Sequence, residues 1–167
     1  MTEPISNSPS LGSAARSLVD LLRRRARETP DRLAYQFLID GKSEGARLTY
    51  RELDHQARAV RDRLLRSGQR GDRALLIYPP GHEFLPAFFG CLYAGIIAIP
   101  LPPPDSARLT RALPRLKAVT ADAQASLVLT TAGIHRTLER HLDADFLKLS
   151  SSKLVADAAS VRPNREH

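Results

Sequence analysis

The fold is decided by residues 74–100, which read ALLIYPPGHEFLPAFFGCLYAGIIAIP. Residues 74–78 are continuously apolar, which predicts a strand buried on both faces of a sheet. Pro79-Pro80-Gly81 ends this strand, and residues 83–94 predict a helix that a glycine stops. The apolar run at 96–100 predicts the next buried strand. A strand, a helix and a strand in this order indicate two parallel strands joined by a right-handed crossover.

The sequence that follows continues the alternation of helix and strand. A helix is predicted at about 106–123, and Pro114 inside it predicts a kink or a break into two pieces. Residues 126–130 predict a third buried strand, a short helix follows at about 134–141, and residues 154–156 predict a fourth strand. This order predicts an α/β fold in which flanking helices cover a parallel sheet.

The residues before residue 74 predict a helix, a hairpin and a second helix. The first helix, at 17–29, places its leucines on one face and its arginines on the remainder, which is typical of a helix with one solvated face. Residues 32–39 and 46–48 flank an Asp40-Gly41 turn, which predicts an N-terminal hairpin ahead of the main sheet.

The second helix has the clearest start in the sequence. Thr49 is an N-cap candidate, and Glu52 three residues later completes a capping box. Gly68 stands where a left-handed C-cap is expected. The apolar stripe between these two ends consists of Leu53, Ala57, Val60 and Leu64.

The composition excludes several classes of protein. Hydrophobic residues make up 43% of the 167 residues and charged residues 26%, so a disordered chain is excluded. The single cysteine, Cys91, excludes a disulfide framework and cysteine-based zinc sites. The net charge of +7 comes mainly from arginines that are spread along the chain rather than gathered in a patch, which argues against a nucleic-acid partner.

Two segments bear on the location of the protein. Residues 1–15 are small and polar and predict a flexible leader without the pattern of a signal peptide, so we expect a cytoplasmic protein. The 21 residues 84–104 carry no charge and are long enough to cross a bilayer, but glycines and prolines divide them. A buried helix and strand are the favoured interpretation, and no membrane span is predicted.

The sequence by its own chemistry offers no catalytic, cofactor-binding or metal-binding residue. The five histidines lack the i, i+4 pairing of a metal-binding helix, and neither a nucleophile elbow nor a phosphate-binding glycine loop is present. Ser150-Ser151-Ser152-Lys153 lacks the glycines that such a loop needs. One alternative stays open, namely that Tyr93 or the Pro79-Pro80-Gly81 turn edges a ligand pocket, because ligand sites in α/β folds gather at turns after strands.

Three segments resemble a known family. Residues 48–54, LTYRELD, resemble the first core motif of adenylate-forming ligases, which include acyl-CoA synthetases and peptide-synthetase adenylation domains. Residues 83–100 resemble the second core motif, and their FFGCLYAG sequence with its proline-rich tail is most similar to the fatty acyl-AMP ligase branch. Residues 111–130 are similar to the same branch, so the resemblance covers about residues 17–156.

The resemblance implies that residues 16–156 form the N-terminal part of such a ligase and that residues 157–167 lead toward its phosphate loop. That loop and the catalytic lysine of the family are not found in this sequence, which implies an N-terminal fragment without activity or a bound cofactor of its own. The complete enzyme is expected to use ATP and Mg²⁺ to activate a fatty acid as an acyl-adenylate. The acyl group would then pass to the phosphopantetheine thiol of an acyl carrier protein.

Two other functions stay open at this point. A peptide-synthetase adenylation domain or an acyl-CoA synthetase shares the first core motif. A non-enzymatic basic α/β binding module would use the arginine excess to bind nucleic acid. The salt dependence of DNA or RNA binding would distinguish this module from the ligases, since contacts to phosphates weaken steeply as salt rises.

Overall fold

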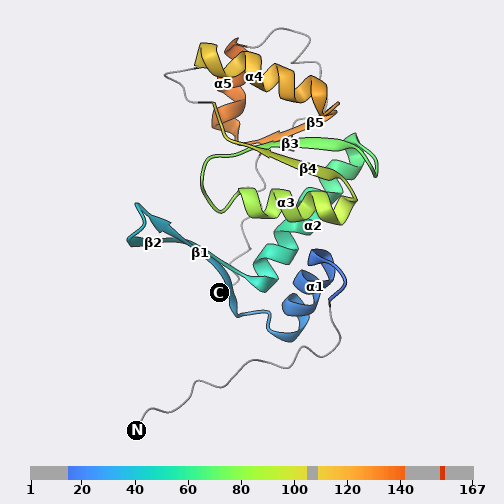
Figure 1. Ribbon diagram of the computed structural model, residues 1–167. Coiled ribbons are helices and arrows are strands. Elements are labelled where there is room, and N and C mark those ends of the chain that lie inside the picture. The colour runs from blue at the N-terminus through green and yellow to red at the C-terminus, as the bar shows by residue number, and fades with distance from the viewer. Residues whose placement is uncertain (1–14, 105–108, 142–154, 157–167) are drawn as a thin grey trace.

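The computed structural model describes residues 15–104, 109–141 and 155–156 (Figure 1). The predicted leader at 1–15, apart from Ala15, and the predicted connector at 157–167 lie outside these residues, as does the run Ser150-Ser151-Ser152-Lys153. The elements in chain order are α1 (Leu18–Glu28), β1 (Leu33–Ile39), β2 (Ser43–Thr49), α2 (Tyr50–Ser67), β3 (Arg73–Ile77), α3 (Phe84–Ala94), β4 (Ile97–Leu101), α4 (Leu109–Asp122), β5 (Leu127–Thr130), α5 (Ala132–His141) and β6 (Val155–Ala156).

Strands β3 to β6 form one sheet in the order β4-β3-β5-β6. Every neighbouring pair is parallel: Leu75 of β3 lies opposite both Ile99 of β4 and Val128 of β5. On the far side of β5, Thr130 lies opposite Ala156 of β6. The predicted sheet of adjacent parallel strands is confirmed, and the short fourth strand joins it. The β1–β2 hairpin is antiparallel and separate from this sheet.

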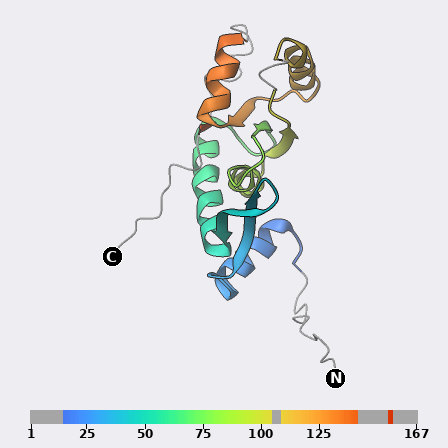
Figure 2. The same cartoon turned by 90° about the vertical axis from the view of Figure 1, so that its left-hand side faces the viewer.

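Helices cover both faces of the parallel sheet (Figure 1, Figure 2). Ala74 and Leu76 of β3 pack with α2 and α3 on one face. Leu75 and Ile77 pack with α4 and α5 on the other. All four side chains are fully buried, as a continuous apolar central strand requires. A further core around Leu22 joins α1 and the base of the hairpin to α2 and α3.

Strand β4 is not the buried strand that its apolar sequence predicts. It lies at the edge of the sheet, and Ile97 is 51% exposed. The Ile97 N–H donates to the carbonyl of Asp72, just before β3, so the alternate residues Ala98 and Pro100 turn their backbone toward the open edge. Pro100 has no N–H to leave unpaired there, which suits an edge position. Sequence alone did not reveal which apolar strand ends the sheet.

The glycine at the end of α2 does not adopt the predicted left-handed conformation. Gly68 has φ of −152° and ψ of −180°, which is extended backbone. A Cβ at this position would lie 2.8 Å from Oδ2 of Asp72 and 2.9 Å from Cδ1 of Leu127. The glycine therefore avoids close contacts with the ends of two side chains, and its backbone angle does not require it. A left-handed glycine does end α3, where Gly95 has φ of 70°.

Helix α4 continues through Pro114, so of the two predicted outcomes the break into two pieces is wrong, and the kink stays a prediction. Proline removes one backbone hydrogen bond of a helix. The packing of Leu116, which is 7% exposed, into the core between α4 and the sheet helps to offset this loss. The predicted start near residue 106 lies outside the described residues.

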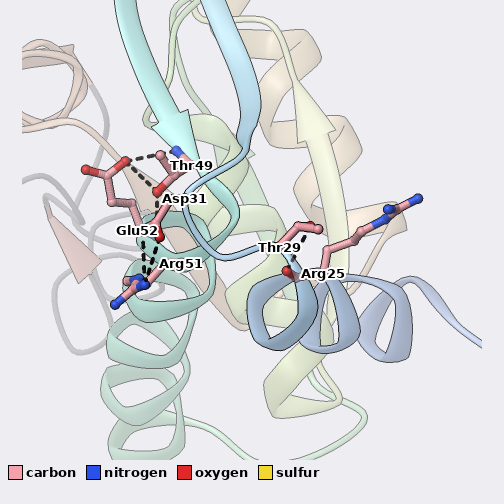
Figure 3. Close-up of polar contacts among 6 residues, drawn as sticks. All are labelled: Arg25, Thr29, Asp31, Thr49, Arg51 and Glu52. Carbon is pink, nitrogen blue, oxygen red and sulfur yellow. Dashed lines mark hydrogen bonds and ion pairs between the residues drawn. The ribbon is translucent and has the colours of Figure 1, made fainter.

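The capping box at the start of α2 is confirmed (Figure 3). The N–H and the hydroxyl of Thr49 both donate to Oε2 of Glu52 at 2.9 Å, and the Glu52 N–H donates to the Thr49 hydroxyl at 3.2 Å. Beside the box, the Arg51 guanidinium pairs with Asp31 at 3.0 Å. The Arg51 N–H also donates to the carbonyl of Pro30. The start of α2 is thereby tied to the segment that links α1 to β1.

The N-terminal elements bury less apolar surface than their sequence predicts. On α1 only Leu22 is buried, whereas Leu18 is 52% exposed. The second strand of the hairpin begins at Ser43, earlier than the predicted 46–48. No helix of the described residues is long and apolar enough to cross a membrane, and residues 84–104 contain α3, β4 and the segments that follow them.

Candidate functional site

The carboxyl ends of β3 and β4 lie side by side, and each strand leads into a proline-rich segment. Ile77 pairs with Leu101 at the last position of their register. Pro79-Pro80-Gly81 follows β3, and Pro102-Pro103-Pro104 follows β4. Ligands of open parallel sheets bind outside the carboxyl ends of the strands. The region at the carboxyl ends of β3 and β4 is therefore the candidate functional site.

A cleft of about 960 Å³ lies between the hairpin and these two segments. We call it the hairpin cleft; it is lined by residues 37–40, 45–46, 78–82, 84 and 101–103, most of them apolar. The ring of His82 packs edge-on against Phe37 with 6.1 Å between the ring centres, which joins the turn after β3 to the hairpin. The Pro79-Pro80-Gly81 turn thus lines a cleft, and its contact with a ligand stays a prediction.

A second hollow, of about 320 Å³, lies between the proline run and α4. This α4 hollow shares residues 101–103 with the hairpin cleft, and its α4 side consists of Arg111, Ala112, Arg115, Leu116 and Val119. Both arginines are exposed. The sequence patterns described above do not predict this hollow. The available signal was a pair of arginines spaced four residues apart on a helix that follows three prolines.

Tyr93 lines neither hollow. Its hydroxyl donates to Oδ1 of Asp54 at 2.6 Å, and Nε of Arg58 donates to the other oxygen of the same carboxylate at 2.7 Å. The guanidinium carbon of Arg23 lies 4.8 Å from the centre of the Tyr93 ring. Burial, and then the bond to Asp54, raise the pKa of Tyr93, so its hydroxyl stays protonated at neutral pH. Tyr93 therefore holds α1, α2 and α3 together.

The remaining reactive side chains do not converge on a site. Cys91 is fully buried in α3, and burial raises the pKa of its thiol to about 12, so it offers no thiolate. His55 is exposed, and His135 lies 3.2 Å from Glu139 one turn along α5. Among the residues that the structure describes, no group of three or more His, Cys, Asp or Glu side chains could hold a metal ion.

Residues 22–166 match the protein family described as AMP-binding enzyme. The chain belongs to this family. The match covers most of the 167 residues and includes both core motifs.

Two relatives and one solved structure show which members of the family this chain resembles. The medium-chain-fatty-acid–[acyl-carrier-protein] ligase JamA of Moorena producens is 54% identical over 114 residues, which are 68% of this chain and 19% of JamA. Disco-interacting protein 2 homolog B of Mus musculus is 35% identical over 150 residues, 89% of this chain and 10% of that protein. The fatty acyl-adenylate ligase of L. pneumophila, in complex with acyl adenylate and pyrophosphate, is 32% identical with a TM-score of 0.72 over 87% of this chain and 24% of that chain.

These relatives confirm the resemblance to fatty acyl-AMP ligases that the core motifs indicated. They also confirm the fold class, since the Legionella ligase has the same arrangement over most of the chain. The chain spans about a fifth of the length of JamA and about a quarter of the Legionella ligase.

Proposed function

We propose that this chain is the N-terminal part of an ATP-dependent fatty acyl-AMP ligase, with residues 16–156 inside the adenylating domain and residues 157–167 leading toward its phosphate loop. The observation that carries the proposal is the similarity to the Legionella ligase, whose structure holds an acyl adenylate and pyrophosphate. The name of JamA, a medium-chain-fatty-acid–[acyl-carrier-protein] ligase, supports a fatty acid as the substrate.

In the proposed reaction, a carboxylate oxygen of the fatty acid attacks the α-phosphorus of ATP while the bond to pyrophosphate breaks. The thiol of a carrier then attacks the acyl carbonyl carbon and displaces AMP. Such a reaction depends on holding the carboxylate and the α-phosphate in a fixed pose and on donors for the developing charge. In this proposal the chain contributes an α/β unit to the enzyme. The carboxyl ends of its parallel strands, together with the hairpin cleft, would border the site where the acid and ATP react.

Mg²⁺ usually accompanies ATP in reactions of this kind, because it balances the phosphate charge. The described residues do not fit such an ion, since they contain no cluster of carboxylates or other ligands that could hold it. We therefore derive no step through a metal held by this chain. We also assign no catalytic or cofactor-binding role to its residues, and we expect the 167-residue chain alone to be inactive.

We propose an acyl carrier protein as the acceptor and the cytoplasm as the location; the name of JamA supports the acceptor. Nucleic acid is not a proposed partner despite the charge of +7. Several arginines form ion pairs with nearby carboxylates, as Arg51 does with Asp31 and Arg58 with Asp54. This use of arginine is expected of a solvated surface rather than of a groove that follows phosphates.

The test is a graft in which residues 16–156 replace the matching segment of the Legionella ligase. Mass spectrometry of the reaction with octanoate and ATP should detect octanoyl-AMP. A carrier protein with its phosphopantetheine arm should accept the acyl group, and coenzyme A should not. The unaltered Legionella ligase is the positive control. A folded graft that forms no acyl-adenylate would contradict the proposal.

A further inference from the structure

We propose that the outer half of the hairpin, residues 37–46, is a flap that opens and closes over the hairpin cleft. In the structure the flap is closed, and the contact between the rings of Phe37 and His82 holds it in this position. Its motion would control access to the cleft whatever reaction the whole protein catalyses.

The base of the hairpin is fixed to the helices. Leu48 of β2 is buried, and it packs together with Ala34 of β1 in the core that includes Leu22 of α1. The Tyr50 N–H donates to the carbonyl of Arg32, which ties the start of α2 to the start of β1. The base therefore has little freedom to move.

A bulge separates this base from the flap. Between two regular pairs of the ladder, the single residue Phe37 of β1 faces both Gly45 and Ala46 of β2. A bulge of this kind interrupts the ladder, bends the strand and can re-aim a side chain. Gly45 suits it, because a Cβ there would lie 2.9 Å from the carbonyl oxygen of Phe37. The ladder is thus interrupted where the flap begins.

Beyond the bulge, the flap is a regular hairpin. Asp40 and Gly41 have φ of 51° and 68°, and a type I′ turn requires positive φ at both of these positions. The Lys42 N–H donates to the carbonyl of Ile39 at 3.0 Å, which closes the turn. The flap can therefore move as one piece.

The flap meets the body of the protein across the cleft. The hairpin projects away from the helices (Figure 1), and its residues 37–40 and 45–46 line the cleft opposite residues 78–82. Leu38 and Ile39 are more than half exposed, so they do not fix the flap as Leu48 fixes the base. The rings of Phe37 and His82, whose centres are 6.1 Å apart, join the two sides. Such a pair shifts an equilibrium by about twofold to tenfold, so it can hold the flap closed and still release it.

Hydrogen exchange of the 167-residue chain, read by mass spectrometry, tests the motion, with α3 as the internal reference. His82→Ala removes the ring contact and leaves the sequence of the hairpin unchanged. The amides of residues 37–46 should then exchange about twofold to tenfold faster, while those of α3 keep their rate. His82→Phe keeps a ring and should restore slow exchange. Equal exchange in the parent chain and His82→Ala, an equal rise in α3, or no recovery in His82→Phe would overturn the proposal.

A thiol placed in the cleft tests access. Gly81→Cys is suitable, because the nearest heavy atom to a Cβ at Gly81 is 3.9 Å away. A bulky maleimide should label this thiol about twofold to tenfold faster when Phe37→Ala is added to Gly81→Cys. Leu38→Ala, at an exposed neighbour of Phe37, is the matched control and should leave the rate nearly unchanged.

The buried thiol of Cys91 monitors the fold in the same samples. It should stay unlabelled while the thiol of Gly81→Cys reacts, since opening of the flap leaves α3 packed. Equal labelling of Gly81→Cys with and without Phe37→Ala would show that the hairpin does not cover the cleft. Labelling of Cys91 at the same rate would show that the whole chain unfolds. Either result would overturn the proposal.

Discussion

The Tyr93 hydroxyl donates a hydrogen bond of 2.6 Å to Oδ1 of Asp54, which joins α3 to α2 across 39 positions of sequence. Arg58 donates to the other oxygen of the same carboxylate, and Arg23 of α1 lies over the Tyr93 ring. One tyrosine thus connects three helices on one side of the sheet. Helix α3 contains no charged residue, so the phenol of Tyr93 is the group through which this apolar helix makes a hydrogen bond to α2.

We predict that Tyr93→Phe lowers the free energy of unfolding by about 1–2 kcal/mol, because it removes a partly buried hydrogen bond to a charged group. Urea unfolding followed by circular dichroism measures the change. Tyr35→Phe is the matched control, since Tyr35 is 40% exposed on the hairpin. Equal effects of the two substitutions would show that the Tyr93–Asp54 bond does not stabilise the fold.

We also predict that this bond makes stability depend on pH at the alkaline end. Burial and the bond to Asp54 raise the pKa of Tyr93 in the folded chain above its ordinary value of about 10. The folded state therefore holds this proton more tightly, so the contribution is complete below pH of about 10 and is lost as the pH rises above it. The urea midpoint should fall more steeply above pH of about 10 in the parent chain than in Tyr93→Phe. Parallel curves would contradict the assignment.

Gly90 allows α3 to cross α2 at close range. A Cβ at Gly90 would lie 2.5 Å from Cγ1 and 2.6 Å from Cβ of Val60, and 3.1 Å from the carbonyl oxygen of Ala57. We predict that Gly90→Ala destabilises the chain by about 1–3 kcal/mol, because the helices must move apart. Thermal or urea unfolding measures the loss.

The control for this substitution is Gly133→Ala on α5. The nearest heavy atom to a Cβ at Gly133 is 3.9 Å away, so alanine fits and should stabilise the helix slightly. Val60→Ala combined with Gly90→Ala should recover only a small part of the lost stability, since it removes Cγ1 but keeps the Cβ of residue 60, which lies 2.6 Å from the new methyl group. If Gly90→Ala changed the stability as little as Gly133→Ala, the packing of α3 against α2 would be looser than described.

The thiol of Cys91 should report on unfolding. The side chain is fully buried, and burial raises its pKa to about 12, so it is both protonated and inaccessible in the folded chain. We expect an aromatic disulfide reagent at pH of about 8 to label the folded chain at a small fraction of the rate seen in denaturant. Rapid labelling of a chain that retains its circular dichroism spectrum would mean that α3 opens readily.

The hairpin leaves apolar side chains in solvent, with Leu38 53% and Ile39 57% exposed. Exposed apolar surface of this kind favours association, so we predict that the isolated chain self-associates despite its net charge of +7. Sedimentation velocity should show mass increasing with concentration, and Leu38→Lys with Ile39→Lys should reduce this increase. Ser43→Lys with Gln69→Lys, which adds the same charge at two exposed polar residues, is the control for added charge alone. A parent chain that stays monomeric would refute the prediction.

Local sequence signals predicted the elements that depend on local chemistry. The capping box of Thr49 and Glu52 involves residues three apart, so it is visible in the sequence before any packing is known. The continuous apolar run of β3 predicted burial on two faces, and this strand does lie between β4 and β5. In such cases the short-range pattern and the final packing agree.

Other features depend on neighbours that are distant in sequence. The apolar run of β4 looks like that of β3, but only the strand order makes Ile97 an edge residue. Part of the crowding at Gly68 comes from Leu127, which no local pattern connects to it. The candidate site is of the same kind, because its two hollows bring the segment after β4 against the hairpin on one side and α4 on the other.

The most direct test of the central claim is fatty-acid-dependent release of pyrophosphate from ATP, measured on the 167-residue chain and on its graft into the Legionella ligase. Adenylation needs a fixed pose of the carboxylate and the α-phosphate. Such positioning can lower the activation barrier by roughly 7–11 kcal/mol. A unit that only borders this site should therefore be inactive alone. We predict no release from the chain and clear release from the graft. Appreciable release from the isolated chain, or none from a folded graft, would contradict the account.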